Sequence, residues 1–414
     1  MKKIIFITSY PEKGLTHGKK TVGVASYAKN TVNSIRNLDN KSKIFVLAEK
    51  LDGQTQNYRE NGINIVRCWK RNSLLFPFQI VSQLIKIKPN ISVLEYEMAM
   101  LGNPIMNVFV PCLLIVNKVM KTKNIIVIHQ VVDNFSQMHG HMGMKKDSTK
   151  IKLLNIVSRI FYKTILTLSD KTIVFEEFLK ERLSEHGNAD RICVIPHGVE
   201  KIQNIPSKQI ARKRLGISKD EFVLISFGYL AWYKGSDWLA KKADKLIKKN
   251  KKIRVIFAGG PNPNHADKEH YNSYISKINH LADRSNGKLS ITGYVEEKDI
   301  SIYYSASDLV VLPYRANMSS SGPLSICFST GKPFLISKPL SPYNNTADFA
   351  NSLTKSSLNM EDLTFSLSGN DFENKIIKLH NDRLKLNKIE MISSQLAKSR
   401  SWENIAKEYL TIFD

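Results

Sequence analysis

Residues suited to phosphate binding follow short apolar runs in the second half of this chain. The segment from Gly228 to Gly235 combines turn-forming glycines with Lys234, which can reach a phosphate as a point charge. Gly259 follows a second run, and Ser321-Gly322-Pro323-Leu324 opens a helix whose first N–H groups can cradle a diphosphate. Since these pieces recur in order beyond successive strands, they predict an anion-binding site at one sheet edge.

The first half offers acid–base candidates at similar positions. Glu95 and Glu97 end an apolar run and lie on the same side of a strand, so they are either a solvated strand terminus or an acid–base site. His129 ends another run, where a core role and a ligand-facing role are both consistent with the pattern. Gly23 precedes a helix start that can attract an anion, although such a glycine is often only part of a turn.

Metal and disulfide chemistry have little support in the sequence. His139-Gly140-His141 has ligand-like spacing, but such a triplet in a Gly- and Met-containing loop is usually only loop. The four cysteines are far apart and form no CxxC pair, which disfavours a disulfide framework and a structural zinc site. We therefore predict no metal site.

Strand-like and helix-like segments alternate twice along the chain, with a break around 196–207. Expected strands cover 4–9, 43–47, 63–68, 91–94, 124–129, 171–175, 222–227, 253–258, 289–292, 309–312 and 333–337. Expected helices include 24–38, 78–87, 152–168 and a last one over 405–409. This alternation predicts an α/β protein with two doubly wound parallel sheets, and ligands bind such sheets beyond the carboxyl ends of the strands.

The net charge of the chain indicates which classes of partner it can bind. The 414 residues carry a formal net charge of +24, which predicts an anionic partner such as a phosphate-bearing ligand, acidic lipid or nucleic acid. The basic residues are scattered and no nucleic-acid module is recognisable, so no nucleic-acid partner is expected. Neither a signal peptide nor an apolar run long enough to span a bilayer is evident, which predicts a cytoplasmic protein.

Taken together, these motifs resemble the GT-B glycosyltransferases, in particular the retaining family 4, also called glycosyl transferases group 1. The resemblance is strongest within 190–340 and covers almost the whole chain. The segments that carry it are 194–199 (VIPHGV), 228–235, 257–260 (FAGG), 291–295 (ITGYV), 306–314 (ASDLVVLPY) and 320–333.

This resemblance implies a two-domain enzyme with a cleft between Rossmann-like domains. The acceptor domain would cover 1–200 and the nucleotide-sugar domain 201–390, with a C-terminal helix over 391–414, containing Trp402, that crosses back. Lys234 would neutralise the donor diphosphate, Tyr294 and Val295 would border the base, and Gly23 and His129 would face the donor sugar. The predicted donor-binding set is Gly23, Gly228, Tyr229, Lys234, Gly259, Tyr294, Val295, Ser321, Gly322, Pro323 and Leu324.

The chain departs from the usual pattern of this family at three places. Tyr229 stands about where an arginine is common, and Met318 and Ile326 occupy the positions of the usual glutamate pair. One subgroup carries a His-Glu-aromatic-Gly segment in the first domain, which the segment 96–102 (YEMAMLG) resembles, and this makes Glu97 a catalytic candidate together with His129.

The resemblance implies a metal-independent, retaining hexosyltransferase that needs no cofactor. Its donor would be a nucleotide-diphospho sugar and its acceptor a saccharide or a lipid-linked saccharide, in the synthesis of a surface polysaccharide or glycoconjugate. The alternatives are a catalytically weak or inactive GT-B partner subunit, favoured by the departures, and a nucleic-acid binder suggested by the charge.

Basic and large apolar residues alternate in one part of the first half. Such a mixture suits an anionic membrane surface, and would place the protein peripherally on the inner face of the plasma membrane. The helical spacing of Leu75, Phe78, Val81 and Leu84 is equally typical of a core-facing stripe. The residues concerned are Trp69, Lys70, Arg71, Leu74, Leu75, Phe76, Phe78, Lys86 and Lys88, with a second basic group at Lys145, Lys146, Lys150 and Lys152.

Overall fold

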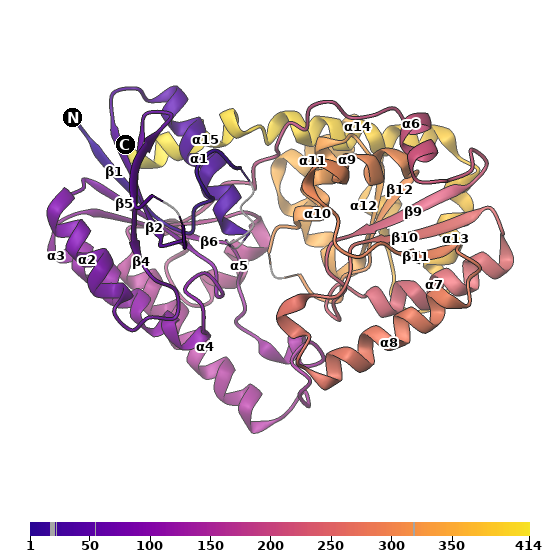
Figure 1. Ribbon diagram of the computed structural model, residues 1–414, viewed down its shortest axis with the longest axis horizontal. Helices are drawn as coiled ribbons and strands as arrows, with labels where there is room; N and C mark the ends of the chain where they lie inside the picture. The colour runs from indigo at the N-terminus through magenta and orange to yellow at the C-terminus, as the bar shows by residue number, and fades with distance from the viewer. Residues whose placement is uncertain (17–20, 22, 54, 318) are drawn as a thin grey trace.

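Two parallel sheets, one in each half of the chain, form the framework of the computed structural model (Figure 1). The structure describes residues 1–16, 21, 23–53, 55–317 and 319–414. The first sheet has the order β3-β4-β2-β1-β5-β6-β7-β8, and only β3 runs antiparallel to its neighbour. Its strands are β1 (Lys3–Ile7), β2 (Lys43–Glu49), β3 (Asn57–Glu60), β4 (Ile63–Trp69), β5 (Ile91–Tyr96), β6 (Lys123–Ile128), β7 (Lys171–Val174) and β8 (Ile192–Val194).

Helices cover both faces of the first sheet, because its strands are apolar on both sides. One face packs against α2, α3, α4 and α5, and the other against α1 and the C-terminal α15. The helices and 3₁₀ turns of this half are α1 (Val24–Leu38), α2 (Phe76–Ile87), η1 (Pro104–Phe109), α3 (Val110–Val119), η2 (Phe135–Met138), α4 (Thr149–Leu168), α5 (Glu177–Ser184) and η3 (Ala189–Arg191).

The second sheet is entirely parallel, with the order β11-β10-β9-β12-β13-β14. Its strands are β9 (Phe222–Phe227), β10 (Ile253–Ala258), β11 (Leu289–Ile291), β12 (Leu309–Leu312), β13 (Phe334–Ser337) and β14 (Thr364–Phe365). Its helices and turns are α6 (Lys208–Arg214), α7 (Ser236–Lys249), η4 (Pro263–His265), α8 (Glu269–Asp283), α9 (Glu297–Ala306), α10 (Gly322–Ser329), η5 (Lys338–Asn345), α11 (Ala347–Lys355), α12 (Met360–Leu363), α13 (Asp371–His380) and α14 (Arg383–Ser399).

The chain crosses between the two halves twice. The first crossing follows β8, and the second joins α14 to α15 (Trp402–Phe413), which returns to pack along α1 (Figure 1). The two crossings meet, since Val199 N–H donates to Arg400 O over 2.7 Å. The predicted α/β class is therefore confirmed, whereas the boundaries 1–200, 201–390 and 391–414 stay predictions.

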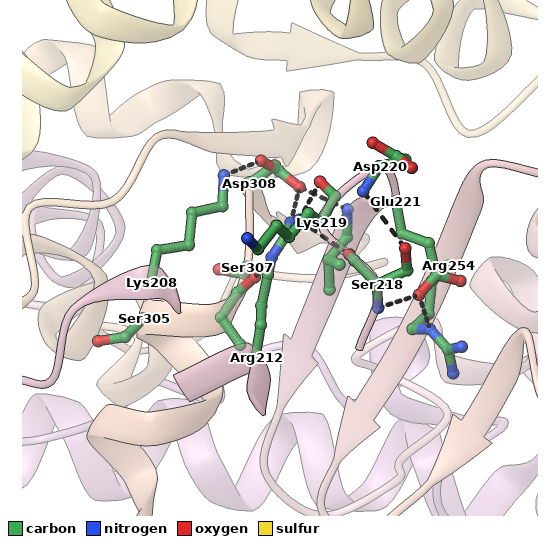
Figure 2. A network of polar contacts seen from close by, with 12 residues as sticks. Lys208, Arg212, Ser218, Lys219, Asp220, Glu221, Arg254, Ser305, Ser307 and Asp308 are labelled. Carbon is green, nitrogen blue, oxygen red and sulfur yellow. Dashed lines mark hydrogen bonds and ion pairs between the residues drawn. The ribbon is translucent and has the colours of Figure 1, made fainter. Parts of the chain in front are cut away.

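A buried ion cluster fastens α6 to the second sheet (Figure 2). Asp308, just before β12, accepts from Arg212 Nη2 over 2.6 Å and from Val223 N–H over 2.7 Å, and it also pairs with Lys208. The Arg212 guanidinium donates in addition to the carbonyls of Ala306 and Lys219. Asp308 belongs to the ASDLVVLPY segment, so that part of the motif is structural here.

Replacing Asp308 by Asn should destabilise the protein by about 3–5 kcal/mol, because it leaves the buried Arg212 without its carboxylate. Urea denaturation followed by fluorescence measures the change. Asp244→Asn is the matched control: it removes an exposed pair with Lys248 on one helix turn and should cost under about 0.5 kcal/mol. Equal losses in the two variants would contradict a structural role for the cluster.

Candidate active site

A cavity of about 770 Å³ lies between the two halves of the molecule. We call it the main cavity. The start of α1 and the segment after β8 form one side, and the starts of α9 and α10 form the other. Its wall includes Gly23, Ser26, Tyr27, Asn30, His197, Gly198, Glu200, Lys201, Glu297, Ser301, Gly322, Ser325, Ile326, Ser329 and Trp402.

Two of the predicted donor-binding glycines, Gly23 and Gly322, line this cavity from opposite sides. A Cβ atom built on either glycine would meet nothing within 4 Å. Their φ angles are not in the left-handed region, so neither glycine is required by backbone strain. What both provide is free space at the start of a helix, where unpaired N–H groups and the helix dipole favour an anion.

The start of α10 is held rigidly from behind. Ser321 caps the helix, its hydroxyl accepting from Leu324 N–H over 3.3 Å and lying 3.2 Å from the hydroxyl of Tyr314. Its own N–H donates to Tyr343 OH over 2.9 Å. Tyr304 OH donates to Pro323 O over 2.8 Å. The predicted segment 321–324 is therefore a fixed helix start, and Ser321 and Leu324 line a small pocket beside it.

The glycines of the Lys234 loop are needed for close backbone packing. Gly228 has a φ of 99°, which favours glycine. A Cβ on Gly259 would lie 2.1 Å from the carbonyl oxygen of Gly228. Arg315 braces the same loop, since it donates to Trp232 O over 2.5 Å and pairs with Asp237 over 2.7 Å. Because β9 and β12 are neighbours, this loop lies beside the segment that leads into α10.

Lys234 is partly buried, and its ammonium group has no hydrogen-bond or ion-pair partner among the described residues. Desolvation of its ammonium group lowers the pKa of Lys234 to about 8. A Cβ on Gly228 would come within 3.0 Å of Nζ, so that glycine leaves the space in which the ammonium lies. An unpaired, desolvated cation beside a helix start is suited to binding a phosphate.

The positions of the remaining predicted donor residues give no support to a role in donor binding. Tyr294 is 73% exposed and Tyr229 39% exposed, and neither lines the main cavity, nor does Val295. Ile326, at one of the two positions where the family pattern has glutamate, lies in the cavity wall. Met318, at the other, lies outside the described residues. The roles of these residues stay predictions.

His129 ends β6 and is held by Glu95, whose side chain is fully buried. The distance between Glu95 Oε2 and His129 Nε2 is 2.6 Å. Burial raises the pKa of Glu95 and lowers that of His129 to about 3. Both shifts favour a neutral pair, in which the Glu95 hydroxyl donates to Nε2 of His129. Glu95 is therefore neither a solvated strand terminus nor a residue that faces the cleft. Its side chain instead orients the imidazole of His129.

Aromatic rings surround His129 and fix its plane. Tyr27 of α1 and Phe175 lie with their ring centroids 4.8 and 4.9 Å from His129. Tyr27 in turn contacts His197 at 5.0 Å and Trp402 at 5.2 Å, so the cluster joins both chain crossings to the end of β6. As a result, only 9% of the surface of His129 is exposed to solvent.

Glu97 lies directly beyond β5 and is only partly buried, and burial raises its pKa. Glu97 also interacts electrostatically with Tyr233 of the second half of the chain. Burial, and after it the charge of Glu97, raises the pKa of Tyr233 to about 12. Glu97 therefore lies near the residue that precedes Lys234, on the opposite side of the domain interface.

The loop with His139 and His141 packs against the second half. His139 lies 5.1 Å from Trp232, and His141 lies 5.3 Å from both Tyr233 and His265, measured between ring centroids. The one group of potential metal ligands within the described ranges is Asp133, Glu185 and His186, which excludes this loop. His139-Gly140-His141 is therefore an interdomain contact.

Sequence reasoning missed the polar environment of three residues near the interface. Counting only the described residues, both side-chain polar atoms of Asn317 are buried without a hydrogen-bond partner, and so is Nε1 of Trp402, a residue of the main cavity. Glu176 was not singled out either, yet it is fully buried between the two halves. No periodicity or spacing marks these residues, since their function depends on contacts between distant segments.

Comparisons with known proteins agree with this architecture. Residues 221–341 match the family model described as Glycosyl transferases group 1. An uncharacterized glycosyltransferase of Methanocaldococcus jannaschii is 23% identical over 189 residues, and the match spans 46% of this chain and 45% of that protein, less than half of its length.

Solved structures match over the whole chain. Sucrose-phosphate synthase of Thermosynechococcus elongatus has a TM-score of 0.71 at 14% identity, covering 100% of this chain and 98% of that one. HepE of Anabaena in complex with UDP has a TM-score of 0.66 at 14% identity, covering 100% and 99%. These likenesses confirm the predicted GT-B fold and, with the family match, the predicted resemblance.

Lys234→Met should weaken binding of a nucleoside diphosphate by about 1.5–3 kcal/mol, the range for hydrogen bonds to charged groups. Calorimetric titration with UDP, GDP and ADP measures the loss. The unliganded variant should be no less stable than the wild type, because an unpaired desolvated charge is removed. Lys241→Met, in the adjoining helix, is the control and should keep the wild-type affinity; an unchanged affinity in Lys234→Met would contradict the assignment.

Proposed function

We propose that this chain, whose second domain is a group 1 glycosyltransferase domain, transfers a sugar from a nucleotide-diphospho-sugar donor to a saccharide or lipid-linked acceptor. The observation that carries the proposal is the ammonium of Lys234, which has no partner within the described residues and belongs to a loop that packs against the 313–315 segment leading to the braced start of α10. HepE, which shares the fold, was solved with UDP, and this supports a diphosphate donor of the same type.

Stabilisation of the leaving diphosphate is the main chemical contribution of this site. Lys234, the Gly322 N–H and the dipole of α10 are oriented before the reaction, so charge that develops on the leaving group meets fixed positive potential. Such a site supplies its cation from a side chain, in keeping with the proposed metal-independent transfer. Glu97 and His129 belong to the first domain, which we propose holds the acceptor.

We assign Glu97 the catalytic role from the first domain. Its raised pKa suits a carboxyl that acts on an acceptor hydroxyl or stabilises positive charge on the donor sugar. His129 stays neutral because of its low pKa, so it donates or accepts a hydrogen bond and carries no charge. A retaining outcome is part of the proposal on the basis of the family resemblance.

One observation favours the alternative of a non-catalytic binding subunit. Ile326 offers an apolar side chain to the main cavity at a position where the family pattern has a glutamate. A subunit of this kind would bind the donor without turning it over. Donor binding therefore tests the site, and turnover separates the two functions.

We also propose that the protein works at an anionic membrane surface, in the synthesis of a surface polysaccharide or glycoconjugate. No helix in the described part of the chain is long and apolar enough to cross a bilayer. The helices α2, α3 and α4 lie side by side on one face of the first sheet (Figure 1). These helices, the segment before α2 and the turn η1 expose large apolar side chains: Leu74, Leu75, Phe78, Ile85, Ile105, Val108, Ile115, Val119, Leu153, Ile156, Val157 and Ile160.

Part of the competing interpretation of this region is wrong. Leu84 is buried, but Leu75 and Phe78 are 62% and 71% exposed, so the stripe through them is not a core face. The three helices contain no acidic residue. Exposed lysines and arginines accompany the apolar side chains, including Lys86, Lys118, Lys152, Arg159 and Lys163. Such a surface complements anionic lipid, each basic residue adding about 1 kcal/mol.

Glu97→Gln should lower kcat at least about a hundredfold, the lower end of what a general acid–base group contributes, while the midpoint of thermal unfolding stays nearly unchanged. The assay is sugar transfer and donor hydrolysis with a panel of nucleotide sugars. Glu403→Gln, which changes an exposed carboxyl on α15, is the control variant and should keep wild-type turnover. A wild-type protein that binds donors but never turns them over would favour the binding subunit; full activity in Glu97→Gln would refute the role of Glu97.

Ile156 and Ile160 lie one turn apart on the exposed side of α4 and offer a direct test of membrane binding. The wild type should sediment with vesicles of phosphatidylglycerol and phosphatidylethanolamine at low salt and be released at high salt. The double variant with Glu at both positions should remain in the supernatant. Leu384→Glu, an equally exposed position in the second domain, should sediment like the wild type; wild-type protein that never sediments would contradict the proposal.

A further inference from the structure

Glu176 is a carboxylate that leaves its own helix uncapped. It occupies the N-cap position of α5, where an acidic side chain ordinarily accepts from the first N–H groups of the helix. Its side chain makes no such bond and is fully buried. All of its side-chain partners come from the second half of the chain and the crossing to α15.

Three segments converge on this carboxylate. Oε1 accepts from Ser320 Oγ and from Arg400 Nη1, both over 2.9 Å. Oε2 accepts from Thr346 Oγ1 over 2.9 Å. Thr346 is the N-cap residue of α11, and its hydroxyl likewise serves Glu176 instead of its own helix. Arg400 is shared with Asp348, to which its Nε donates over 2.7 Å.

Ser320 links this cluster to the donor-binding segment. It immediately precedes Ser321, the N-cap residue of α10, and the small pocket beside the start of α10 is lined by Glu176, Ser320, Ser321 and Arg400. The hydrogen bond from Ser320 to Glu176 therefore fixes the entry to α10 from the first domain. Tyr314 and Tyr343 attach this helix start to the second domain. The first domain also contacts the segment before it, through a β-bridge between Gln130 and Ser319 and a hydrogen bond from Arg182 to Asn317 O.

We propose that Glu176 is a positioning residue: through Ser320 it holds the start of α10 in its diphosphate-binding geometry, so that the donor site is complete only when the two domains are docked. This inference rests on the proposed function, because it concerns the same donor site. It goes beyond that function by making donor affinity depend on a contact across the domain interface. A charge-assisted bond with a buried carboxylate provides the necessary rigidity.

The test compares variants that break different parts of the cluster. Ser320→Ala removes only the link to α10, and Ser320→Thr keeps the hydroxyl. Glu176→Gln weakens both the link and the pair with Arg400. Asp348→Asn weakens Arg400 from its other side and leaves Ser320 untouched. Each variant is titrated with the nucleoside diphosphate that the wild type binds best among UDP, GDP and ADP, and its thermal midpoint is recorded.

Ser320→Ala should raise the dissociation constant about tenfold to a hundredfold, a change typical of one lost hydrogen bond to a charged group, with the thermal midpoint nearly unchanged. Ser320→Thr should restore wild-type affinity. Asp348→Asn should lower the thermal midpoint without changing affinity. In Glu176→Gln, adding Ser320→Ala should have a smaller effect than in the wild type, because both changes act on one bond.

Two outcomes would overturn the inference, and a third concerns the proposed function. Additive losses in the double variant would mean that Ser320 contacts the ligand itself, and unchanged affinity in Ser320→Ala would mean that the cluster is only structural. Wild-type protein that binds none of the three nucleotides would refute the donor site, and with it the inference. Since the wild type is measured first, the two failures are distinguishable.

Discussion

The ammonium group of Lys234 is the constraint on which the proposed site depends, because it is desolvated and has no counter-ion in the described parts of the chain. Taking a lone charge out of water is unfavourable by several kcal/mol in proteins, and a partner that restores its pairing is bound correspondingly well. The surrounding structure maintains this unfavourable state: Gly228 and Gly259 let the loop pack tightly, and Arg315 is committed to bracing it. The same loop lies beside the start of α10, where N–H groups supply further positive potential.

The domain interface determines whether these groups act together. Glu176, Arg400 and the aromatic cluster around Tyr27 and His129 tie both chain crossings to the carboxyl edges of the two sheets. Each sheet alone presents only half of the site, with Glu97 and His129 on one side and Lys234 on the other. The position of α15 against α1 then completes the first domain with a segment from the far end of the chain.

Local pattern predicted the framework well. The helix over 24–38 and the strands over 222–227, 253–258 and 309–312 have the observed bounds, because strong apolar periodicity and flanking glycines determine them. The antiparallel β3 escaped notice, since its four residues form a polar edge. Glu95 and Glu176 could not be assigned either, because burial of a carboxylate depends on partners 34 and 224 residues away. Leu75 and Phe78 have the spacing of core residues but are exposed, because the spacing does not determine which segments pack against that side of the helix.

Proton uptake on binding tests the central role of Lys234 most directly. With a pKa of about 8, the free amine is roughly nine-tenths deprotonated at pH 9, and a bound diphosphate should reprotonate it. Titration with UDP, GDP or ADP in buffers of different ionisation enthalpy should therefore show uptake of about 0.9 proton at pH 9 and about 0.1 at pH 7. Lys234→Met should show none at either pH. Uptake that is absent at pH 9, or that persists in Lys234→Met, would contradict the account.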